Sequence, residues 1–277
     1  MRIALAQMCS GIDPGENAEQ LRSLIAEAAA GGAAMIFTPE MSGLLDRNRS
    51  RAAGVIRTER EDTVLAAVCS EAQKRKIWVQ LGSLAVRTSG DAQDKWVNRS
   101  YLINPAGEVD ARYDKIHLFD VDLGPGESQR ESSAYARGHR AVVAPLPEAK
   151  LGLSICYDLR FSALYEALTN AGAEILSIPA AFTVPTGKAH WEILLRARAI
   201  EAGAFVVAAA QYGRHADGRS TYGHSMVVDP WGEILLDMGE GTGLGFCDLD
   251  LGKVGEVRSR VPAVANRQRF EAPATSS

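Results

Sequence analysis

Cys156 is the residue of this sequence whose surroundings most clearly favour chemistry. It follows the apolar run Leu-Gly-Leu-Ser-Ile at 151–155, and the chain beyond it turns into a helical pattern. A strand that delivers a side chain into a sharp turn before a helix forms a nucleophile elbow. Nearby helix N-terminal N–H groups lower the pKa of a thiol at that position and can also stabilise an oxyanion. The sequence therefore predicts Cys156 as a nucleophile.

A carboxyl group and an ammonium group also stand at the ends of apolar runs. Glu40 follows Phe-Thr-Pro, and in an enclosed site its pKa would rise toward neutrality, as a general base requires. From that stretch alone, a solvated loop carboxylate is the favoured alternative. Lys115 precedes Ile-His-Leu-Phe and would stabilise a developing oxyanion, although a lone lysine usually faces solvent. We expect His117 to make a core hydrogen bond rather than bind a metal.

A cysteine, a glutamate and a lysine together suggest a thiol amide hydrolase that uses a carboxylate as its base. A protease with a Cys-His-Asn site would need a histidine at a comparable strand end. The other cysteines, Cys9, Cys69 and Cys247, lie within apolar patterns and are interpreted as buried, inert thiols. The four cysteines are scattered without paired spacing, so we expect reduced thiols, no metal site and no cofactor.

Composition excludes several classes of protein. The chain has 277 residues, of which 46% are hydrophobic and 23% charged, values typical of a soluble globular protein. Its net charge of −4, without a basic stripe, argues against nucleic-acid binding. The longest uncharged apolar run, 202–210, falls short of the roughly 20 residues that cross a bilayer. The apolar start breaks at Gln7, too early for a signal peptide, so a cytoplasmic protein is expected.

Strand and helix patterns alternate along the chain and predict one α/β domain over 1–271, with 272–277 as a disordered tail. Strands are expected at 2–8, 33–38, 77–85, 98–104, 109–115, 140–144, 151–156, 174–179, 205–211, 225–229, 233–237 and 244–249, and helices at 17–30, 61–76, 161–171 and 188–202. Hairpins in both halves favour two stacked sheets covered by helices, a four-layer αββα sandwich, over a single doubly wound parallel sheet.

Three segments together resemble the signature blocks of the nitrilase superfamily of carbon–nitrogen hydrolases. They are Thr-Pro-Glu at 38–40, Tyr-Asp-Lys-Ile-His-Leu-Phe at 113–119 and Leu-Ser-Ile-Cys-Tyr-Asp-Leu-Arg-Phe at 153–161, in the family's order. The resemblance runs from Arg2 to about Phe270 and implies the αββα sandwich. It also implies that Cys156 is the nucleophile, Glu40 its base, and Lys115 an oxyanion stabiliser together with the backbone N–H of Tyr157.

A second active-site glutamate is typical of the family and lies in the loop after the lysine block. Glu131 fits that place best, and Glu127 is the second choice. Nitrilases proper usually carry Trp-Glu after the cysteine, whereas this chain has Tyr157-Asp158, which is similar to the amidase-like Nit branch. The resemblance therefore makes nitriles unlikely as substrates.

The second half of the chain is most similar to deaminated glutathione amidases, on the segments 187–192, 195–201, 209–215 and 222–232. That resemblance implies hydrolysis of a small α-keto acid amide through a Cys thioester, with deaminated glutathione giving α-ketoglutarate and Cys-Gly. The alternatives are an omega-amidase acting on α-ketoglutaramate, an N-carbamoyl amine hydrolase, and a binding subunit that has lost catalysis. The family also implies a homodimer or higher homo-oligomer, built partly on the helix around Trp191.

Four residues are expected to bind the substrate. Arg160 could pair with a substrate carboxylate, or form a structural ion pair with an acidic neighbour on its helix. Ser162-Ala163 stands where the branch commonly has Pro-Glu, a departure that affects the packing beneath Arg160. Tyr212, with Arg214 and His215, could lie beside a Cys-Gly leaving group or belong to an ordinary exposed loop. Phe182 and Thr183 complete the set.

Overall fold

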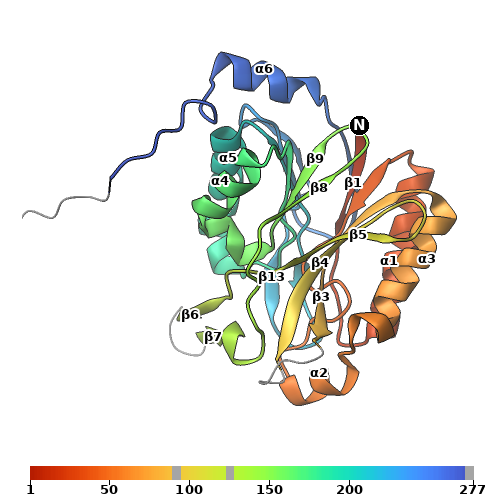
Figure 1. The fold of residues 1–277 in the computed structure, drawn as a ribbon. Coiled ribbons are helices and arrows are strands. Elements are labelled where there is room, and N and C mark those ends of the chain that lie inside the picture. Colours follow the sequence, from red (N-terminus) through yellow and green to blue (C-terminus); the bar gives the residue numbers. More distant parts are fainter. Residues whose placement is uncertain (89–94, 123–127, 272–277) are drawn as a thin grey trace, which may run out of the picture.

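The computed structural model describes residues 1–88, 95–122 and 128–271, and its centre is a pair of six-stranded mixed sheets (Figure 1). The first sheet has the order β16-β1-β2-β3-β4-β5. Its strands are β1 (Arg2–Gln7), β2 (Met35–Phe37), β3 (Trp78–Arg87), β4 (Trp96–Ile103), β5 (Val109–Asp114) and β16 (Gly243–Asp248). The strands β1, β2 and β3 are parallel, and antiparallel neighbours extend the sheet on both sides.

The second sheet repeats this plan with the order β15-β14-β11-β10-β9-β8. Its strands are β8 (Val142–Pro145), β9 (Lys150–Leu153), β10 (Ile175–Ser177), β11 (Phe205–Ala208), β14 (Met226–Val228) and β15 (Ile234–Asp237). The strands β9, β10 and β11 are parallel, and the outer pairings are antiparallel. Each half of the chain therefore builds one sheet, as the hairpins in both halves predict.

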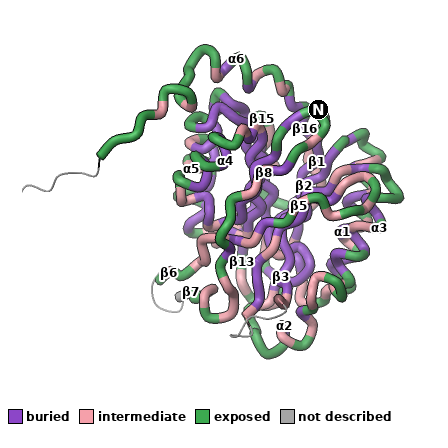
Figure 2. Tube along the Cα trace, viewed as in Figure 1, coloured by how far each residue is buried: buried purple, intermediate pink, exposed green. Residues whose placement is uncertain are grey.

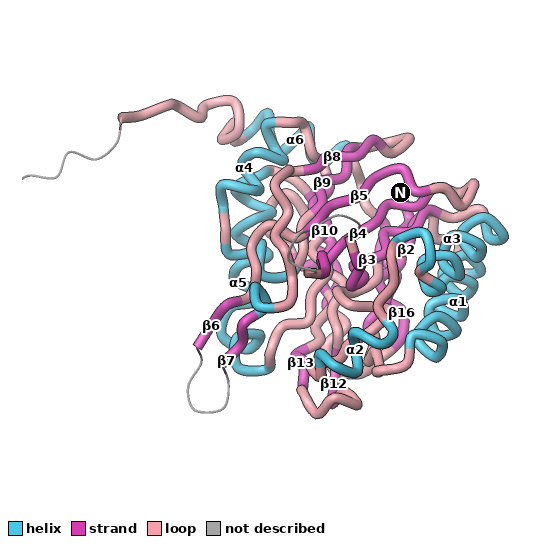
Figure 3. The backbone as a smooth tube through the Cα atoms, turned by 60° about the horizontal axis from the view of Figure 1, so that its bottom comes forward, coloured by secondary structure: helices cyan, strands magenta, loops and turns pink. Residues whose placement is uncertain are grey.

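Helices cover the outer face of each sheet. On one side lie α1 (Pro14–Ala30) and α3 (Thr63–Arg75), and on the other lie α4 (Ser162–Asn170) and α5 (Val184–Ala202), with the strands between them (Figures 1 and 3). This arrangement confirms the predicted four-layer αββα sandwich and excludes the single doubly wound sheet. The last helix, α6 (Gly252–Arg260), follows β16. No helix in the described ranges is long and apolar enough to span a membrane.

Alternation along the strands explains how the layers pack. On β1, Ile3 and Leu5 belong to the cluster between the sheets, which also contains Leu151 of β9. Ala4 and Ala6, which point the opposite way, pack with α1 and α3 instead. Because side chains alternate with a period of two, one strand contributes to both hydrophobic layers. The buried residues accordingly fill the interior of the molecule (Figure 2).

Several elements differ from those expected. Helix α1 begins at Pro14 because the Asp13 carboxylate accepts bonds from the N–H groups of Gly15 and Glu16, at 2.7 and 3.2 Å. Strand β9 ends at Leu153 rather than reaching Cys156. Several short elements were not predicted from the sequence. They are α2 (Arg49–Val55), α6, the hairpin β6 (Asp120–Asp122) with β7 (Ser128–Arg130), the hairpin β12 (Tyr212–Arg214) with β13 (Ser220–Tyr222), and short 3-10 turns at Glu59–Glu61, Glu131–Ser133 and Cys156–Arg160. The predicted tail, 272–277, lies outside the described residues.

Candidate active site

Cys156 lies at a sharp turn between β9 and the 3-10 turn Cys156–Arg160. Its φ of 49° is in the left-handed region that residues other than glycine rarely adopt. Its backbone N–H donates to the carbonyl of Pro179 at 2.9 Å, and its side chain is buried. Strained backbone of this kind persists where the surrounding contacts fix it, commonly at functional sites. The geometry is that of the predicted nucleophile elbow.

Asp158 fastens this turn to the segment that carries Lys115. Its fully buried carboxylate accepts bonds from the Tyr113 hydroxyl at 2.7 Å and from the backbone N–H groups of Ile155 and His117 at 2.9 and 3.0 Å. The Nδ1 atom of His117 lies 2.7 Å from the same carboxylate. His117 therefore makes the structural hydrogen bond that we expected, and Asp158 fixes the elbow relative to the end of β5.

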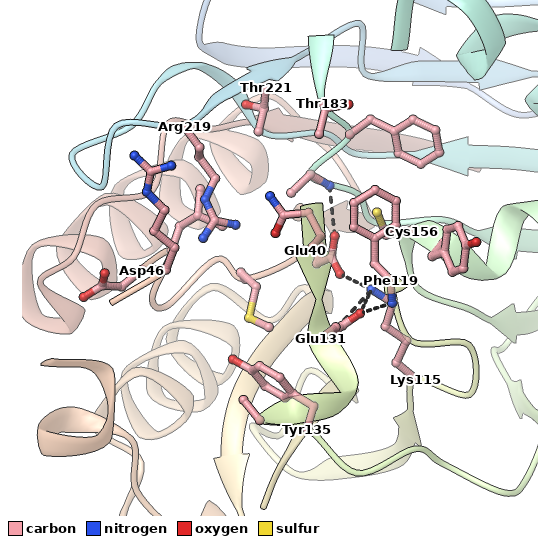
Figure 4. Close-up of a pocket in the computed structure, with 18 of the residues that line it drawn as sticks. Glu40, Asp46, Lys115, Phe119, Glu131, Tyr135, Cys156, Thr183, Arg219 and Thr221 are labelled. Carbon is pink, nitrogen blue, oxygen red and sulfur yellow. Dashed lines mark hydrogen bonds and ion pairs between the residues drawn. The ribbon is translucent and has the colours of Figure 1, made fainter. Parts of the chain in front are cut away.

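Lys115, Glu40 and Glu131 form an ionic cluster beside Cys156, in which Lys115 and Glu40 are buried (Figure 4). The Lys115 Nζ atom lies 2.8 Å from Glu40 Oε1 and 3.0 Å from Glu131 Oε2. Lys115 and Glu40 are 2% and 5% exposed, which excludes the alternative of solvated side chains. The structure thus brings together the four residues for which the sequence analysis expected catalytic roles.

Neutral groups complete the contacts of the two carboxylates. The Nδ2 atom of Asn98, on β4, donates to Glu40 Oε1 at 2.9 Å and to Glu131 Oε1 at 3.3 Å. The backbone N–H of Ala181 donates to Glu40 Oε2 at 3.0 Å, and that of Phe119 to Glu131 Oε2 at 2.6 Å. Asn98 was not identified from the sequence, although it is a buried amide that contacts both carboxylates.

The electrostatics of the cluster set the resting protonation state of the thiol. Burial and the nearby charge of Glu40 raise the pKa of Cys156 well above its usual value, and Lys115 opposes that rise only in part. The expectation of a lowered pKa is therefore wrong, because burial and the charge of Glu40 both disfavour a thiolate at this position. Burial lowers the pKa of Lys115, but the charges of Glu131 and Glu40 outweigh it and hold that pKa well above its usual value. These shifts favour a protonated Lys115 and a neutral Cys156 thiol before the substrate binds.

These groups open into a cavity of about 460 Å³. Its wall includes Tyr157, Phe182 and Thr183 from the expected set, together with the aromatic side chains of Trp96, Phe119 and Tyr135. The wall also carries arginines that were not among the predicted site residues, including Arg47 and Arg219. A cavity of this size suits a small organic molecule rather than a polymer.

Two of the residues expected to bind the substrate do not themselves line the cavity. Neither Arg160 nor Tyr212 is among the described residues that line the cavity. The Nη1 and Nη2 atoms of Arg160 each lie 3.3 Å from His190 Nδ1, and the guanidinium lies over the Tyr157 and Phe182 rings, 5.9 and 5.5 Å from their centroids. The Tyr212 hydroxyl contacts Glu240 at 3.4 Å. Arg160 therefore contacts the back of the cavity wall through two of its aromatic rings.

The remaining expectations concern other cysteines and the second glutamate. All four cysteines are free thiols, but only Cys247 joins Cys156 in being buried. Cys9 and Cys69 are partly exposed, so the prediction of buried thiols is wrong for them.

Glu127, the second choice after Glu131 for the second active-site glutamate, lies outside the described residues. In the described part of the chain, no group of three or more His, Cys, Asp or Glu side chains is arranged to hold a metal ion.

Comparison with known proteins agrees with this geometry. Residues 2–259 match the family model described as carbon-nitrogen hydrolase. The deaminated glutathione amidase of Yersinia enterocolitica is 43% identical over 84% of this chain and 81% of its own length. The crystal structure of the C. elegans NitFhit protein superimposes with a TM-score of 0.88 at 36% identity, covering 96% of this chain and 65% of that protein's chain.

A third similar protein is the amidase from Nesterenkonia sp. AN1, which has a TM-score of 0.81 and 27% identity over 97% of this chain and 94% of its own. In that structure, a mutant of the amidase, the acetamide moiety of fluoroacetamide is covalently attached to the active-site cysteine.

Proposed function

Since the chain belongs to the carbon–nitrogen hydrolase family, we propose that it is an amidase that cleaves the amide of a small α-keto acid through a thioester on Cys156. The observation that carries the proposal is the placement of Glu40, Lys115, Glu131 and Cys156 in one cavity. Deaminated glutathione is the substrate that the relatives favour, and its products would be α-ketoglutarate and Cys-Gly.

In the first half of the reaction, Glu40 takes the proton of the Cys156 thiol as Sγ attacks the amide carbon. A neutral thiol with a raised pKa needs such a base beside it, because little thiolate exists before the substrate binds. The amide oxygen becomes an oxyanion that Lys115 and the backbone N–H of Tyr157 stabilise. Among the described residues, Lys115 Nζ bonds only to Glu40 and Glu131, which leaves one of its three N–H groups for the oxyanion.

The protonated Glu40 then gives its proton to the nitrogen of the leaving group, the C–N bond breaks, and the thioester remains. In the second half, Glu40 takes a proton from water, whose oxygen attacks the thioester carbon. The C–S bond breaks and Glu40 returns the proton to the sulfur, so the enzyme ends as it began. Glu131 holds Lys115 in place throughout, because it bonds both to Nζ and to the backbone of Phe119.

The covalent adduct on the cysteine of the Nesterenkonia amidase supports the assignment of Cys156 as the nucleophile. An intact Glu40, Lys115 and Cys156 also argues against a binding subunit that has lost catalysis, because a site without function tolerates loss of such residues.

We further propose that the protein works in the cytoplasm as a homodimer without a cofactor. Four free cysteines are consistent with the reducing cytoplasm.

A paired assay tests the substrate. Purified protein is incubated with deaminated glutathione or with α-ketoglutaramate, and the α-ketoglutarate formed from each is measured. The proposal predicts a larger kcat/KM for deaminated glutathione. A large preference for α-ketoglutaramate would instead identify an omega-amidase, and release of ammonia and CO₂ from N-carbamoyl amines alone would identify an N-carbamoyl amine hydrolase.

A further inference from the structure

The cavity continues past the reacting groups to a wall that the proposed chemistry does not use. Arg47 and Arg219 belong to this wall, which we call the arginine wall. In Figure 4, Arg219 lies on the opposite side of the cavity from Cys156 and Lys115. Two guanidinium groups facing a cavity that also holds a nucleophile are suited to hold a remote anionic part of the substrate.

One buried carboxylate bonds to the backbone of Arg47 and to the guanidinium of Arg219. Asp217 Oδ2 accepts a bond from the backbone N–H of Arg47 at 2.9 Å and from the Arg219 Nε atom at 2.6 Å. Its other oxygen accepts from the Arg219 backbone N–H at 3.0 Å. The Asp217 side chain is fully buried, whereas that of Arg219 is 33% exposed. Asp217 therefore joins two segments that are far apart in sequence, and it fixes the Arg219 guanidinium and the backbone of Arg47 before any ligand binds.

The arginine wall retains positive charge after its internal pairs are formed. Asp217 compensates the charge of Arg219, yet the Nη groups of Arg219 bond to no described residue. The Arg47 side chain has no hydrogen-bond or ion-pair partner in the described ranges. Asp46, the acidic residue on this side of the cavity, is already paired with Arg51 at 2.6 and 2.8 Å. Guanidinium N–H groups thus remain available to a ligand.

We propose that Arg47 and Arg219 form a subsite for a substrate carboxylate remote from the scissile amide, an inference that rests on the proposed amidase function. Deaminated glutathione has two such carboxylates, one on the keto acid and one on the terminal glycine, and α-ketoglutaramate has only the first. A guanidinium pair binds a carboxylate through parallel charged hydrogen bonds. The subsite would thus select acidic amides over neutral ones of the same size.

Binding measured without turnover tests the subsite. Calorimetry on the Cys156→Ala protein would use deaminated glutathione, its C-terminal amide, which lacks the glycine carboxylate, and 4-oxopentanoyl-Cys-Gly, which lacks the keto acid carboxylate. Adding Arg47→Ala is expected to weaken binding of deaminated glutathione roughly tenfold, the loss of one charged hydrogen bond. Arg47→Ala should leave the affinity unchanged for the one compound that lacks the carboxylate bound by the subsite. The compound with unchanged affinity therefore shows which of the two carboxylates the subsite binds.

Arg140→Ala is the matched control, since it removes the same charge from an exposed position outside the cavity wall. Arg47 suits the test because its side chain is exposed and partnerless in the described ranges, so its removal should not disturb folding. Equal weakening for all three compounds, or none, would overturn the subsite. The proposed function can fail separately. If binding depends on Arg47 but the wild-type protein does not hydrolyse deaminated glutathione, the result would support the subsite and refute the proposed function.

Discussion

Glu40 receives hydrogen bonds from Lys115, Asn98 and the backbone of Ala181, so its carboxylate has a fixed orientation beside the thiol. Replacing it in Glu40→Gln keeps the shape but removes the base. A positioned general base contributes about 10²–10⁴-fold to rate, so kcat/KM should fall by that factor. Steady-state kinetics would measure the loss, with Glu19→Gln on the exposed face of α1 as the control. A Glu40→Gln enzyme with near wild-type kcat/KM would rule out this role.

The raised pKa of Cys156 gives a second prediction for the same residue pair. Because the charge of Glu40 disfavours the thiolate, Glu40→Gln should lower the pKa of Cys156 even as it lowers kcat/KM. The rate of alkylation by iodoacetamide, followed against pH, would report the thiolate fraction. The wild-type rate should still be rising above the usual thiol value of 9.0, and the variant's profile should move to lower pH. A wild-type profile that levels off near neutrality would contradict the account.

Single site residues could be predicted from the sequence where a reactive side chain stands at the end of an apolar run. Cys156, Glu40 and Lys115 each have that local signal. Asn98 has only a weak one, an amide within a strand pattern, because its role depends on the pairing of β4 with β3 and on the loop that carries Glu131. Arg47 is one of several charged residues in Arg-Asn-Arg-Ser-Arg at 47–51, a pattern typical of a solvated loop. Its place in the cavity wall depends on the contact with Asp217, which is distant in sequence.

Among the elements, β3 positions the Glu40 loop through a close backbone contact at Gly82. A Cβ atom there would lie 2.1 Å from the Thr38 carbonyl oxygen and 2.3 Å from that of Pro39. Gly82→Ala must therefore displace the loop, and we expect a loss of about 1–3 kcal/mol in the free energy of unfolding together with reduced kcat. Urea denaturation and activity assays would measure the two effects.

Gly54→Ala on α2 is the matched control, because a Cβ at that position meets no atom within 4 Å. It should be neutral or slightly stabilising, since alanine favours a helix more than glycine does. If Gly82→Ala were as harmless as Gly54→Ala, the close contact would not position the Glu40 loop.

Elements with a long regular pattern were predictable, and short ones were not. The amphipathic face of α1 and the hairpin of β4 and β5 have clear periods in the sequence. Strands β12 and β13 have three residues each, too few to show a period, and they form where Tyr212–Arg214 and Ser220–Tyr222 meet in space. The end of β9 was missed because the apolar pattern continues through Ile155 although the sheet pairing stops.

For the whole molecule, the exposed apolar side chains on α5 and β15 support the proposed homodimer. Ile193 and Ile200 are 69% and 53% exposed, and Ile234 and Leu235 add to the apolar surface of this half. Light scattering at micromolar concentration should give the mass of a dimer, and Ile200→Glu should shift it toward a monomer if α5 is in the interface. A monomeric wild-type protein would contradict the proposed homodimer. The Ile234→Glu variant tests in the same way whether β15 is in the interface.

The layering could be predicted because hairpins occur in both halves and the helix and strand patterns alternate. The strand order could not be predicted. Strand β16, from the far end of the chain, pairs with β1 through backbone hydrogen bonds, and backbone hydrogen bonds do not depend on the pattern of side chains. The cavity is likewise a property of the assembled molecule: it combines the loop after β2, the end of β5 and the turns after β9 and β10.

The acyl group on Cys156 is the central claim. Mass spectrometry of the protein, quenched in acid during turnover of deaminated glutathione, should find the peptide containing Cys156 heavier by the mass of the α-ketoglutaryl group. The Cys156→Ala protein should lack both this adduct and turnover. Full turnover by Cys156→Ala, or rapid wild-type turnover with the acyl group consistently absent from Cys156, would contradict the account.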